Sequence, residues 1–262
     1  GIALSRAIDV HASLVQDRLT ERELLARVAS GLFRAPSVVK ANMLQPLRAA
    51  IYAFKTDFVV ANWIARLKPG DLAAAQAELK SAGFTNPTIR DFDDRPLDIK
   101  AIDKPLDVLM DLEPRSVDTL GFPGRAYDRH SVIGPMLAKA AETGKPAASD
   151  PIPLLKQNGP IGLVLASAIL KEGTAEPVGF VTFSYELASL MLTNDDRSLF
   201  SVVLKDPDDA SDEYVANDQG VISLRAVKQG DPLPSVVRTV TFGGRDWSLA
   251  YYAKNNAVQR AQ

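Results

Sequence analysis

The sequence predicts a mixed α/β (α+β) chain with a long N-terminal helix, a strand–helix–strand body and a smaller, strand-rich C-terminal portion. Three observations support this order. Apolar residues recur at spacings of three and four over about the first 30 residues, which is the helical period. From Asp57 onward the pattern changes to alternation and short apolar runs. The end of the chain then carries several short runs separated by turn residues, as in an antiparallel sheet.

The composition limits the classes of function. A chain of 262 residues can form one large domain or two small ones with a real core. Its net charge of −2 and the lack of a basic block argue against a nucleic-acid partner. The absence of cysteine excludes disulfides, thiolate metal sites and cysteine nucleophiles. No run of about 18 apolar residues and no signal peptide stand out, so we expect a natural soluble protein or a soluble piece of a larger membrane protein.

The N-terminal helix is expected to end near Gly31 and Pro36. Its stripe of residues at helical spacing is Leu4, Ile8, His11, Val15 and Leu19. About 30 residues at 1.5 Å rise give a rod of roughly 45 Å, which favours a stalk or a coiled-coil seam. An amphipathic helix packed on a sheet remains the alternative. A second helix is expected from Ser37 to about Phe54, with a kink at Pro46.

The body of the chain should alternate strands and helices. We expect helices at residues 72–82, 132–143 and 185–193, the first closed by Gly83. Expected strands are residues 58–67, 88–92, 106–113, 145–149, 161–170 and 177–183. The C-terminal strands should be residues 198–204, 221–224, 236–242 and 247–252, with Gly243 and Gly244 as a hairpin turn. The acidic stretch from Asp206 to Glu213 lacks the order of an EF-hand and is expected to be a solvated loop.

Several blocks of residues resemble a known family. They are Asn62-Trp-Ile-Ala-Arg-Leu-Lys-Pro-Gly-Asp-Leu72, Leu112-Glu-Pro114, Leu120-Gly-Phe122, Glu142-Thr-Gly-Lys-Pro146 through Leu155, Gly162-Leu-Val-Leu-Ala166 and Gly179-Phe-Val-Thr-Phe-Ser-Tyr-Glu-Leu187. In this order and spacing they resemble the CHASE domain, the extracytoplasmic sensor module of membrane receptors. The specific blocks cover about residues 58–190, and the general likeness covers about residues 1–252.

The resemblance implies a fold and a role. It implies a stalk helix in residues 1–55, a membrane-distal PAS-like ligand-binding subdomain in residues 56–183 and a membrane-proximal PAS-like subdomain in residues 184–262. It also implies flanking transmembrane helices, a periplasmic location for this part of an inner-membrane protein, and a cytoplasmic histidine kinase or diguanylate cyclase. A parallel homodimer through the N-terminal helix is the implied assembly.

The resemblance also implies a pocket for a small molecule. Its expected lining is Met110, Leu112, Phe122, Tyr127, Ile133, Leu155, Ala166, Phe180 and Phe183. The plant cytokinin receptors of the family carry an aspartate, a threonine and a glycine where this chain has Ile133, Ala166 and Phe183. Because Ile133 and Ala166 offer no side-chain hydrogen bond, we expect a mostly apolar or aromatic ligand in place of cytokinin. Leu155 matches a pocket leucine of those receptors.

Other constellations support no chemistry. His11 on the helix stripe and His130 near a helix start are expected to be solvated or interface histidines, because no partner is spaced to form a triad or metal site. Asp93, Asp94 and Asp128 are expected in turns or caps. We therefore expect no catalytic residues, metal or cofactor. The alternative to a ligand sensor is a dimerisation or protein-interaction module without a small-molecule ligand, and a hydrolase or transferase is disfavoured.

Overall fold

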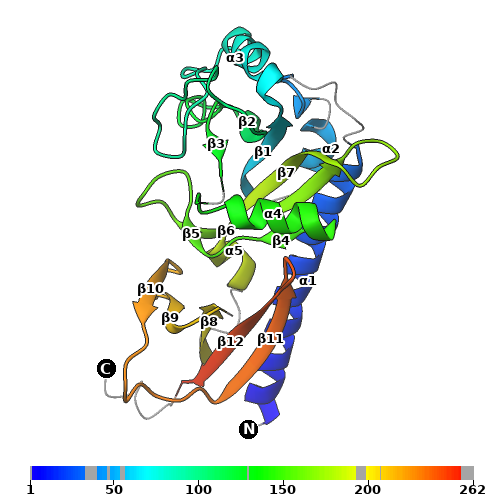
Figure 1. Ribbon diagram of the computed structural model, residues 1–262. Coiled ribbons are helices and arrows are strands. Elements are labelled where there is room, and N and C mark those ends of the chain that lie inside the picture. The colour runs from blue at the N-terminus through cyan, green and yellow to red at the C-terminus, as the bar shows by residue number, and fades with distance from the viewer. Residues whose placement is uncertain are drawn as a thin grey trace. The chain divides into compact units, whose positions relative to one another are not determined.

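The computed structural model describes residues 2–32, 40–45, 48–53, 57–128, 130–192, 199–206 and 208–254 (Figure 1). Its helices are α1 (Ile2–Leu32), α2 (Arg48–Ala53), the 3-10 turn η2 (Pro69–Asp71), α3 (Leu72–Ser81), α4 (Gly134–Thr143) and α5 (Leu187–Met191). Its strands are β1 (Phe58–Leu67), β2 (Leu106–Glu113), β3 (Ala126–Tyr127), β4 (Ala147–Ala148), β5 (Ile152–Pro153), β6 (Ile161–Leu170), β7 (Pro177–Glu186), β8 (Phe200–Asp206), β9 (Asp209–Ala216), β10 (Ile222–Ala226), β11 (Val236–Phe242) and β12 (Arg245–Ala253).

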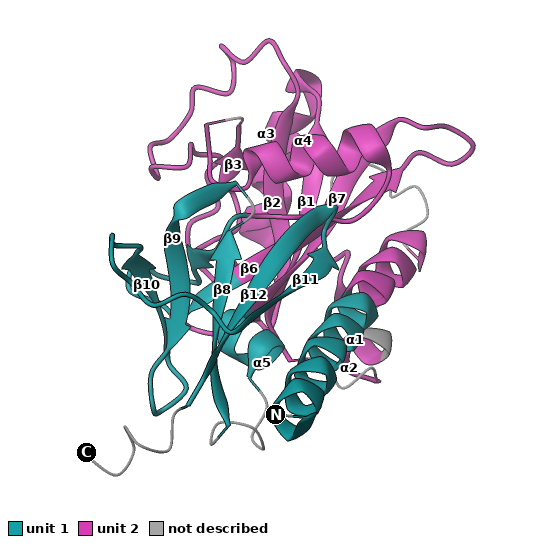
Figure 2. Cartoon of the chain, turned by 90° about the horizontal axis from the view of Figure 1, so that it is seen from below, with its two compact units in different colours: residues 1–22, 150–162, 186–262 teal, residues 23–149, 163–185 magenta. Residues whose placement is uncertain are grey.

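The chain forms two compact units (Figure 2). Unit 1 consists of residues 1–22, 150–162 and 186–262, and unit 2 consists of residues 23–149 and 163–185. Each unit has its own antiparallel sheet after the long helix, so the predicted fold of a stalk helix followed by two PAS-like sheets is confirmed. The division into residues 1–55, 56–183 and 184–262 stays a prediction.

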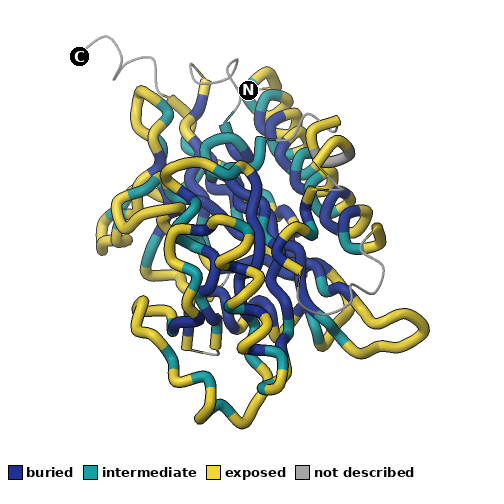
Figure 3. The backbone as a smooth tube through the Cα atoms, turned by 90° about the horizontal axis from the view of Figure 1, so that it is seen from above, coloured by how far each residue is buried: buried dark blue, intermediate teal, exposed yellow. Residues whose placement is uncertain are grey.

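The sheet of unit 2 is built around β1. Its strand order is β3-β2-β1-β7-β6-β4. Buried residues run along these strands, whereas the connecting loops are largely exposed (Figure 3). Alternation assigns the side chains of a strand to two faces. We call these the Phe180 face and the Phe183 face, because the two residues lie three apart in the regular part of β7 and so point to opposite sides.

A β-bulge interrupts the pairing of β1 with β2. Trp63 lies opposite Asp111 and Ile64 lies opposite Leu109, which leaves Met110 as the additional residue. An additional residue shifts the alternation of the strand that carries it. Asp107, opposite Arg66, therefore lies on the Phe180 face, whereas Asp111 lies on the Phe183 face.

Buried carboxylates hold the segment before β1 on the Phe183 face. Asp111 accepts hydrogen bonds from the backbone N–H of Leu44 at 3.0 Å and from Arg115 at 2.8 Å. Burial raises the pKa of the Asp111 carboxyl, and these hydrogen bonds oppose that shift. Glu113 pairs with Arg48 at 2.6 Å and accepts a hydrogen bond from Tyr52 at 2.6 Å. Charge-assisted bonds of this kind are stronger than neutral ones, so α2 is fixed to this face.

The other face of the same sheet lies toward α4. Figures 1 and 2 show α4 and α2 on opposite sides of the strands of unit 2. Since α2 is bonded to the Phe183 face, α4 covers the Phe180 side. This helix starts after Ile133 and ends at Gly144, whose φ of 67° is the left-handed conformation that glycine adopts readily.

Unit 1 contains a five-stranded sheet with the order β10-β9-β8-β12-β11. The first part of α1 is bonded to it. The amide group of Gln16 accepts a hydrogen bond from Thr241 N at 2.8 Å and donates one to Thr241 O at 3.0 Å. Because β11 is an edge strand with unpaired backbone groups, this amide takes the place of a neighbouring strand at one residue. Gly243 and Gly244 both have positive φ and form the predicted hairpin turn between β11 and β12.

Arg90 joins two loops of unit 2. Its guanidinium group is 1% exposed and donates hydrogen bonds to the carbonyl groups of Asn86, Thr88, Gly121, Phe122 and Pro123. It also pairs with Asp94 at 3.1 Å. Gly124 lies against it, and a Cβ atom there would come within 2.6 Å of the Arg90 guanidinium and 2.5 Å of Thr88 O. The loop that leads into β3 is therefore packed around one buried cation.

Most predicted elements are confirmed, including α1, β1, α3, β2, β6 and β11. The strand predicted at residues 88–92 is wrong, because Arg90 turns inward to the carbonyl groups and only isolated bridges form there. The loop predicted from Asp206 to Glu213 is also wrong, because β9 begins at Asp209 and Glu213 is buried against Arg225. The second helix begins only at Arg48, and the predicted positions Ser37 and Pro46 lie outside the described residues. No described helix is long and apolar enough to cross a membrane.

We expect Arg90→Ala to lower the free energy of unfolding by about 3 kcal/mol or more, because the substitution leaves several buried carbonyl groups without a donor. Arg95→Ala is the matched control, since among the described residues the side chain of Arg95 is bonded only to the exposed Asp93 carboxylate. Its effect should stay within about 0.5 kcal/mol. Denaturant unfolding followed by circular dichroism measures both values. Equal stabilities of the two variants would contradict the role of Arg90.

Candidate functional site

The predicted pocket residues do not share one surface. Leu112, Tyr127 and Phe180 lie on the Phe180 face, because Leu112 pairs with Asn62 and Tyr127 pairs with Asp107. Phe183 lies on the opposite face, where its ring is 5.7 Å from that of Phe58 in an edge contact. Phe183 is fully buried there. A ligand on the Phe180 face would therefore not touch Phe183.

The other predicted residues occupy different places. Met110 is the additional residue of the β-bulge. Ala166 on β6 is paired with Ala147 on β4. Ile133 is buried at the start of α4. Phe122 lies in the Arg90 loop, with its ring 5.6 Å from the guanidinium group of Arg125. Leu155 belongs to unit 1, is 40% exposed and has a φ of 65°. That all nine residues line one pocket stays a prediction.

The Phe180 face carries polar residues that the prediction omitted. Arg66 and Asp107 form a two-bond pair, with Nε–Oδ1 at 2.9 Å and Nη2–Oδ2 at 3.2 Å. The guanidinium carbon lies 5.3 Å from the centroid of the Phe180 ring. A cation over an aromatic face is held in place by the ring quadrupole. Arg66 belongs to the family-like block from Asn62 to Leu72. Because it lies two residues from Ile64, alternation along the strand could have placed it on the same face as Ile64.

Tyr127 stands beside this ion pair. It is the strand partner of Asp107, and its ring lies 6.2 Å from that of Phe92. Burial raises the pKa of the Tyr127 phenol, while the positive charge of Arg125 opposes the shift. The phenol is therefore neutral at physiological pH and can donate a hydrogen bond. Arg129, two residues further along the chain, lies outside the described residues.

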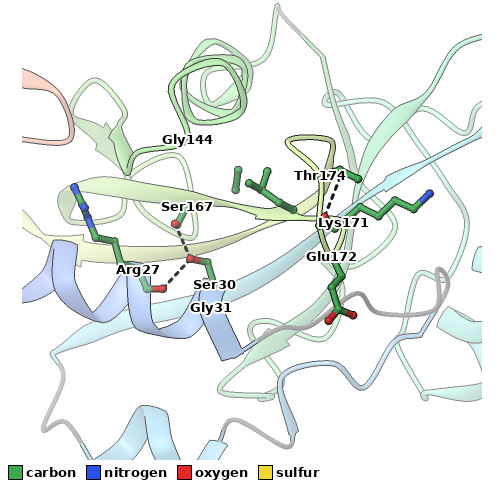
Figure 4. Close-up of a pocket in the computed structure, with 11 residues that line it drawn as sticks. Arg27, Ser30, Gly31, Gly144, Ser167, Lys171, Glu172 and Thr174 are labelled. Atoms are coloured by element: carbon green, nitrogen blue, oxygen red, sulfur yellow. Dashed lines mark hydrogen bonds between the residues drawn. The ribbon is translucent and has the colours of Figure 1, made fainter.

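A cavity lies at the end of α1 in unit 2 (Figure 4). It has a volume of about 440 Å³ and is lined in part by Arg27, Ser30, Ser167, Lys171 and Glu172. Ser167 donates a hydrogen bond to Ser30 at 3.0 Å, and Ser30 donates one to Arg27 O at 2.9 Å. Figure 4 shows the charged ends of Arg27 and Lys171 pointing away from each other. Because these charges do not converge, we assign no ligand to this cavity.

Three carboxylates of unit 1 could in principle bind a cation. The ligand atoms of Asp150, Asp206 and Asp208 lie within 4.8 Å of one another. Arg245 already pairs with all three, at 2.9, 2.9 and 2.6 Å respectively. Its guanidinium carbon also lies 4.6 Å from the centroid of the Trp247 ring. The arginine therefore supplies the positive charge that a metal ion would otherwise bring.

The histidines are not arranged for catalysis. His11 is buried within unit 1, so of the two expected environments, solvated or at an interface, the solvated one is wrong. Its Nε2 donates to Met191 O at 2.7 Å, and its Nδ1 lies 2.6 Å from the Tyr251 hydroxyl. Burial raises the pKa of Tyr251, so this phenol remains protonated and donates to Nδ1. His130 is exposed in the turn that Asp128 caps, as expected for Asp128.

Solved structures share this fold. An extracellular ligand-binding receptor from Desulfohalobium retbaense DSM5692 is similar with a TM-score of 0.58 and 9% identity. The likeness covers 93% of this chain, but this chain spans only 39% of that one. The ligand-binding domain of the amino-acid chemoreceptor PctC of Pseudomonas aeruginosa PAO1, solved with GABA, is similar with a TM-score of 0.55 and 14% identity. Here the likeness covers 96% of this chain and 98% of the other.

A third structure extends the same comparison. The ligand-binding domain of the Pseudomonas fluorescens chemoreceptor CtaA with L-valine has a TM-score of 0.50 and 15% identity, over 98% of this chain and 99% of that one. No curated protein matches this chain by sequence. At these low identities the likeness establishes the fold alone, which has a long helix and tandem PAS-like sheets.

The family follows from a separate comparison. The model of the CHASE domain matches residues 56–215, which is more than half of the chain. The chain therefore belongs to the CHASE domain family, whose members are extracytoplasmic sensor domains. Its place in this family makes it a sensor domain.

We expect the wild-type protein to show no stabilisation by calcium, because Arg245 occupies the centre of the acidic group. Arg245→Ala should lower stability and make it calcium-dependent, with Tm rising by about 2 °C or more in the presence of calcium. Arg238→Ala is the control, since its ion pair with Asp9 lies elsewhere on unit 1. Differential scanning calorimetry with calcium or with chelator measures these shifts. A calcium-dependent Tm in the wild type would contradict the assignment of Arg245 as the counter-ion.

Proposed function

We propose that this chain is the periplasmic ligand-sensing part of a bacterial inner-membrane receptor. Membership of the CHASE family supports the sensory role. The observation that carries the location of the site is the Phe180 face, where a half-buried ion pair and a phenol lie next to apolar residues. Binding pockets combine an apolar lining with a few polar groups that fix orientation. The ligand would bind between this face and α4.

The proposed ligand is small and has a mostly apolar or aromatic body. Leu112 and Phe180 on the face, together with Ile133 at the start of α4, supply the apolar surroundings. The positions at which cytokinin receptors present polar groups are Ile133 and Ala166 here, which disfavours a purine. GABA and L-valine, bound to the similar chemoreceptor domains, support the inclusion of amino acids among the candidates.

The proposed output lies outside this chain. Flanking transmembrane helices would connect the domain to a cytoplasmic histidine kinase or diguanylate cyclase, as the family resemblance implies. A ligand can shift an equilibrium between two receptor states only by its difference in affinity for them. The sensor and its output would thus share two conformational states, and α1 would connect the sensor to the output.

The proposed assembly is a parallel homodimer through α1. Its exposed apolar residues Val10, Leu14, Leu24 and Val28 recur at spacings compatible with a seven-residue repeat. Asp17 and Glu21 fall between them in the same repeat and are also exposed, so the contact would be interrupted in the middle. This apolar stripe also favours the second candidate function, a dimerisation or interaction module without a small-molecule ligand.

A ligand screen separates the two candidate functions. We expect at least one compound from a panel of amino acids, aromatic acids, purines and steroids to raise the Tm of the protein, with isothermal titration calorimetry as confirmation. Tyr127→Phe should weaken that ligand by about 3- to 10-fold, the effect of losing one hydrogen bond. Tyr252→Phe, in unit 1, should not change the affinity. No shift with any compound would favour the interaction module.

The dimer is tested by sedimentation velocity. We expect the wild type to associate with increasing concentration and the double variant Leu24→Glu/Val28→Glu to stay monomeric, because buried carboxylates in a helix seam are strongly unfavourable. Ala74→Glu on the exposed side of α3 is the matched control and should associate like the wild type. A wild type that remains monomeric at every concentration contradicts the proposed dimer of this part.

A further inference from the structure

We propose that the Arg66–Asp107 pair recognises the charged head group of a zwitterionic, amino-acid-type ligand. The ligand carboxylate would bind Arg66 and its ammonium group would bind Asp107. This proposal rests on the proposed function, because it specifies the ligand class of the same site. It adds a polar requirement to a ligand otherwise described only by its apolar body.

The pair is open to a ligand. The side chains of Arg66 and Asp107 are 31% and 15% exposed, so they lie at the margin between the sheet interior and solvent. Charge interactions are stronger there than in bulk water, because the surrounding protein is less polarisable. The position is set by the backbone, since Arg66 and Asp107 are direct partners in the pairing of β1 with β2.

Both members retain free bonding capacity. A guanidinium group has five N–H donors, and Asp107 accepts from two nitrogen atoms of Arg66. Among the described residues no other group bonds to either side chain. The remaining donors of Arg66 and the remaining lone pairs of Asp107 can therefore bind a second carboxylate and an ammonium group without breaking the pair.

The charge balance selects the ligand class. The pair has no net charge. A simple anion attracted to Arg66 would be repelled by Asp107, and a simple cation attracted to Asp107 would be repelled by Arg66. A zwitterion presents an opposite charge to each member. Tyr127, beside Asp107 and neutral, adds a hydrogen-bond donor without changing this balance. Specificity then comes from repulsion of ligands with one charge as well as from attraction.

Phe180 orients the arginine. Its ring is fully buried, and the guanidinium carbon lies 5.3 Å from the ring centroid. This contact fixes the guanidinium group on one side, so fewer side-chain conformations are lost when a ligand binds. Phe180 is therefore a positioning residue for Arg66 in this proposal.

Polar groups farther along the face supply a second observation. Thr182 is the strand partner of Asn62, and both lie on the Phe180 face. The Thr182 hydroxyl is buried without a hydrogen-bond partner in the described part of the chain, and none of the described residues bonds to the side chain of the half-buried Asn62. A buried hydroxyl left unpaired is energetically unfavourable. Asn62 and Arg66 are four residues apart, roughly 13 Å along the strand, and in this proposal the far end of the ligand or a bridging water would bond to these groups.

The test compares matched compounds on the full chain. The zwitterions L-leucine, L-phenylalanine, L-valine and GABA are each paired with the corresponding acid without the amine and the amine without the acid. Isothermal titration calorimetry should show at least one zwitterion binding tenfold or more tightly than both of its analogues. Failure of every zwitterion to bind, or equal binding of an acid analogue, would overturn the head-group assignment.

Two variants connect the preference to the pair. Asp107→Asn keeps the shape but removes the charge, and should weaken the zwitterion tenfold or more while leaving the acid analogue unchanged or improved. Arg66→Lys keeps the charge but loses the two-bond geometry, and should weaken both. Asp93→Asn, in the exposed pair with Arg95, is the matched control. Unfolding of each variant without ligand checks that the fold is retained, and unchanged affinity in folded Asp107→Asn would contradict the proposal.

The outcomes also separate this proposal from the one on which it rests. Binding of a neutral aromatic compound but of no zwitterion would leave the protein a ligand sensor and refute the role of the Arg66–Asp107 pair. Binding of no compound in either panel would contradict ligand sensing itself, and the head-group assignment with it.

Discussion

The buried guanidinium group of Arg90 is the interaction on which the architecture of unit 2 depends. It bonds to the carbonyl groups of five residues from two loops. Carbonyl groups of irregular loops have no ladder to satisfy them, and an unsatisfied buried carbonyl is costly. The guanidinium group of Arg90 donates the hydrogen bonds that a neighbouring strand would otherwise supply to these carbonyl groups. The loop that carries Phe122 and leads to Tyr127 thereby has a defined path, and β3 pairs with β2 in a defined register.

The two faces of the sheet of unit 2 have different roles. Buried acids on the Phe183 face hold the polypeptide before β1, and the aromatic contact of Phe58 with Phe183 adds apolar packing. The Phe180 face carries an ion pair that retains free donors and acceptors. In the first arrangement the carboxylates of Asp111 and Glu113 are buried and hydrogen-bonded, as a scaffold requires. The second is partly exposed, as recognition requires.

The sequence allowed the long helix, the central strands and the family to be predicted, because periodicity and block spacing are local properties. The faces of the sheet on which individual side chains lie were predicted less well. Alternation counted from the sequence assigns residues beyond the bulge at Met110 to the wrong face, and no local sequence feature indicates that bulge. Residues 88–92 alternate like a strand, yet the long-range bonds of Arg90 override that pattern. The acidic stretch from Asp206 to Glu213 looked solvated, but Arg225 on the neighbouring strand pairs with Glu213, and Arg245 from β12 pairs with Asp206. Phe183 was assigned to the pocket from correspondence with a family position, which does not specify the side of the sheet.

Met110 has a further consequence for how such a domain can diversify. Asp107, Asp111 and Glu113 are separated by even numbers of residues, so a regular strand would present all three to the same side. The single additional residue sends Asp107 one way and the other two acids the opposite way. Substitutions that retune what the receptor detects can therefore accumulate around Asp107 without disturbing the contacts that keep the domain folded.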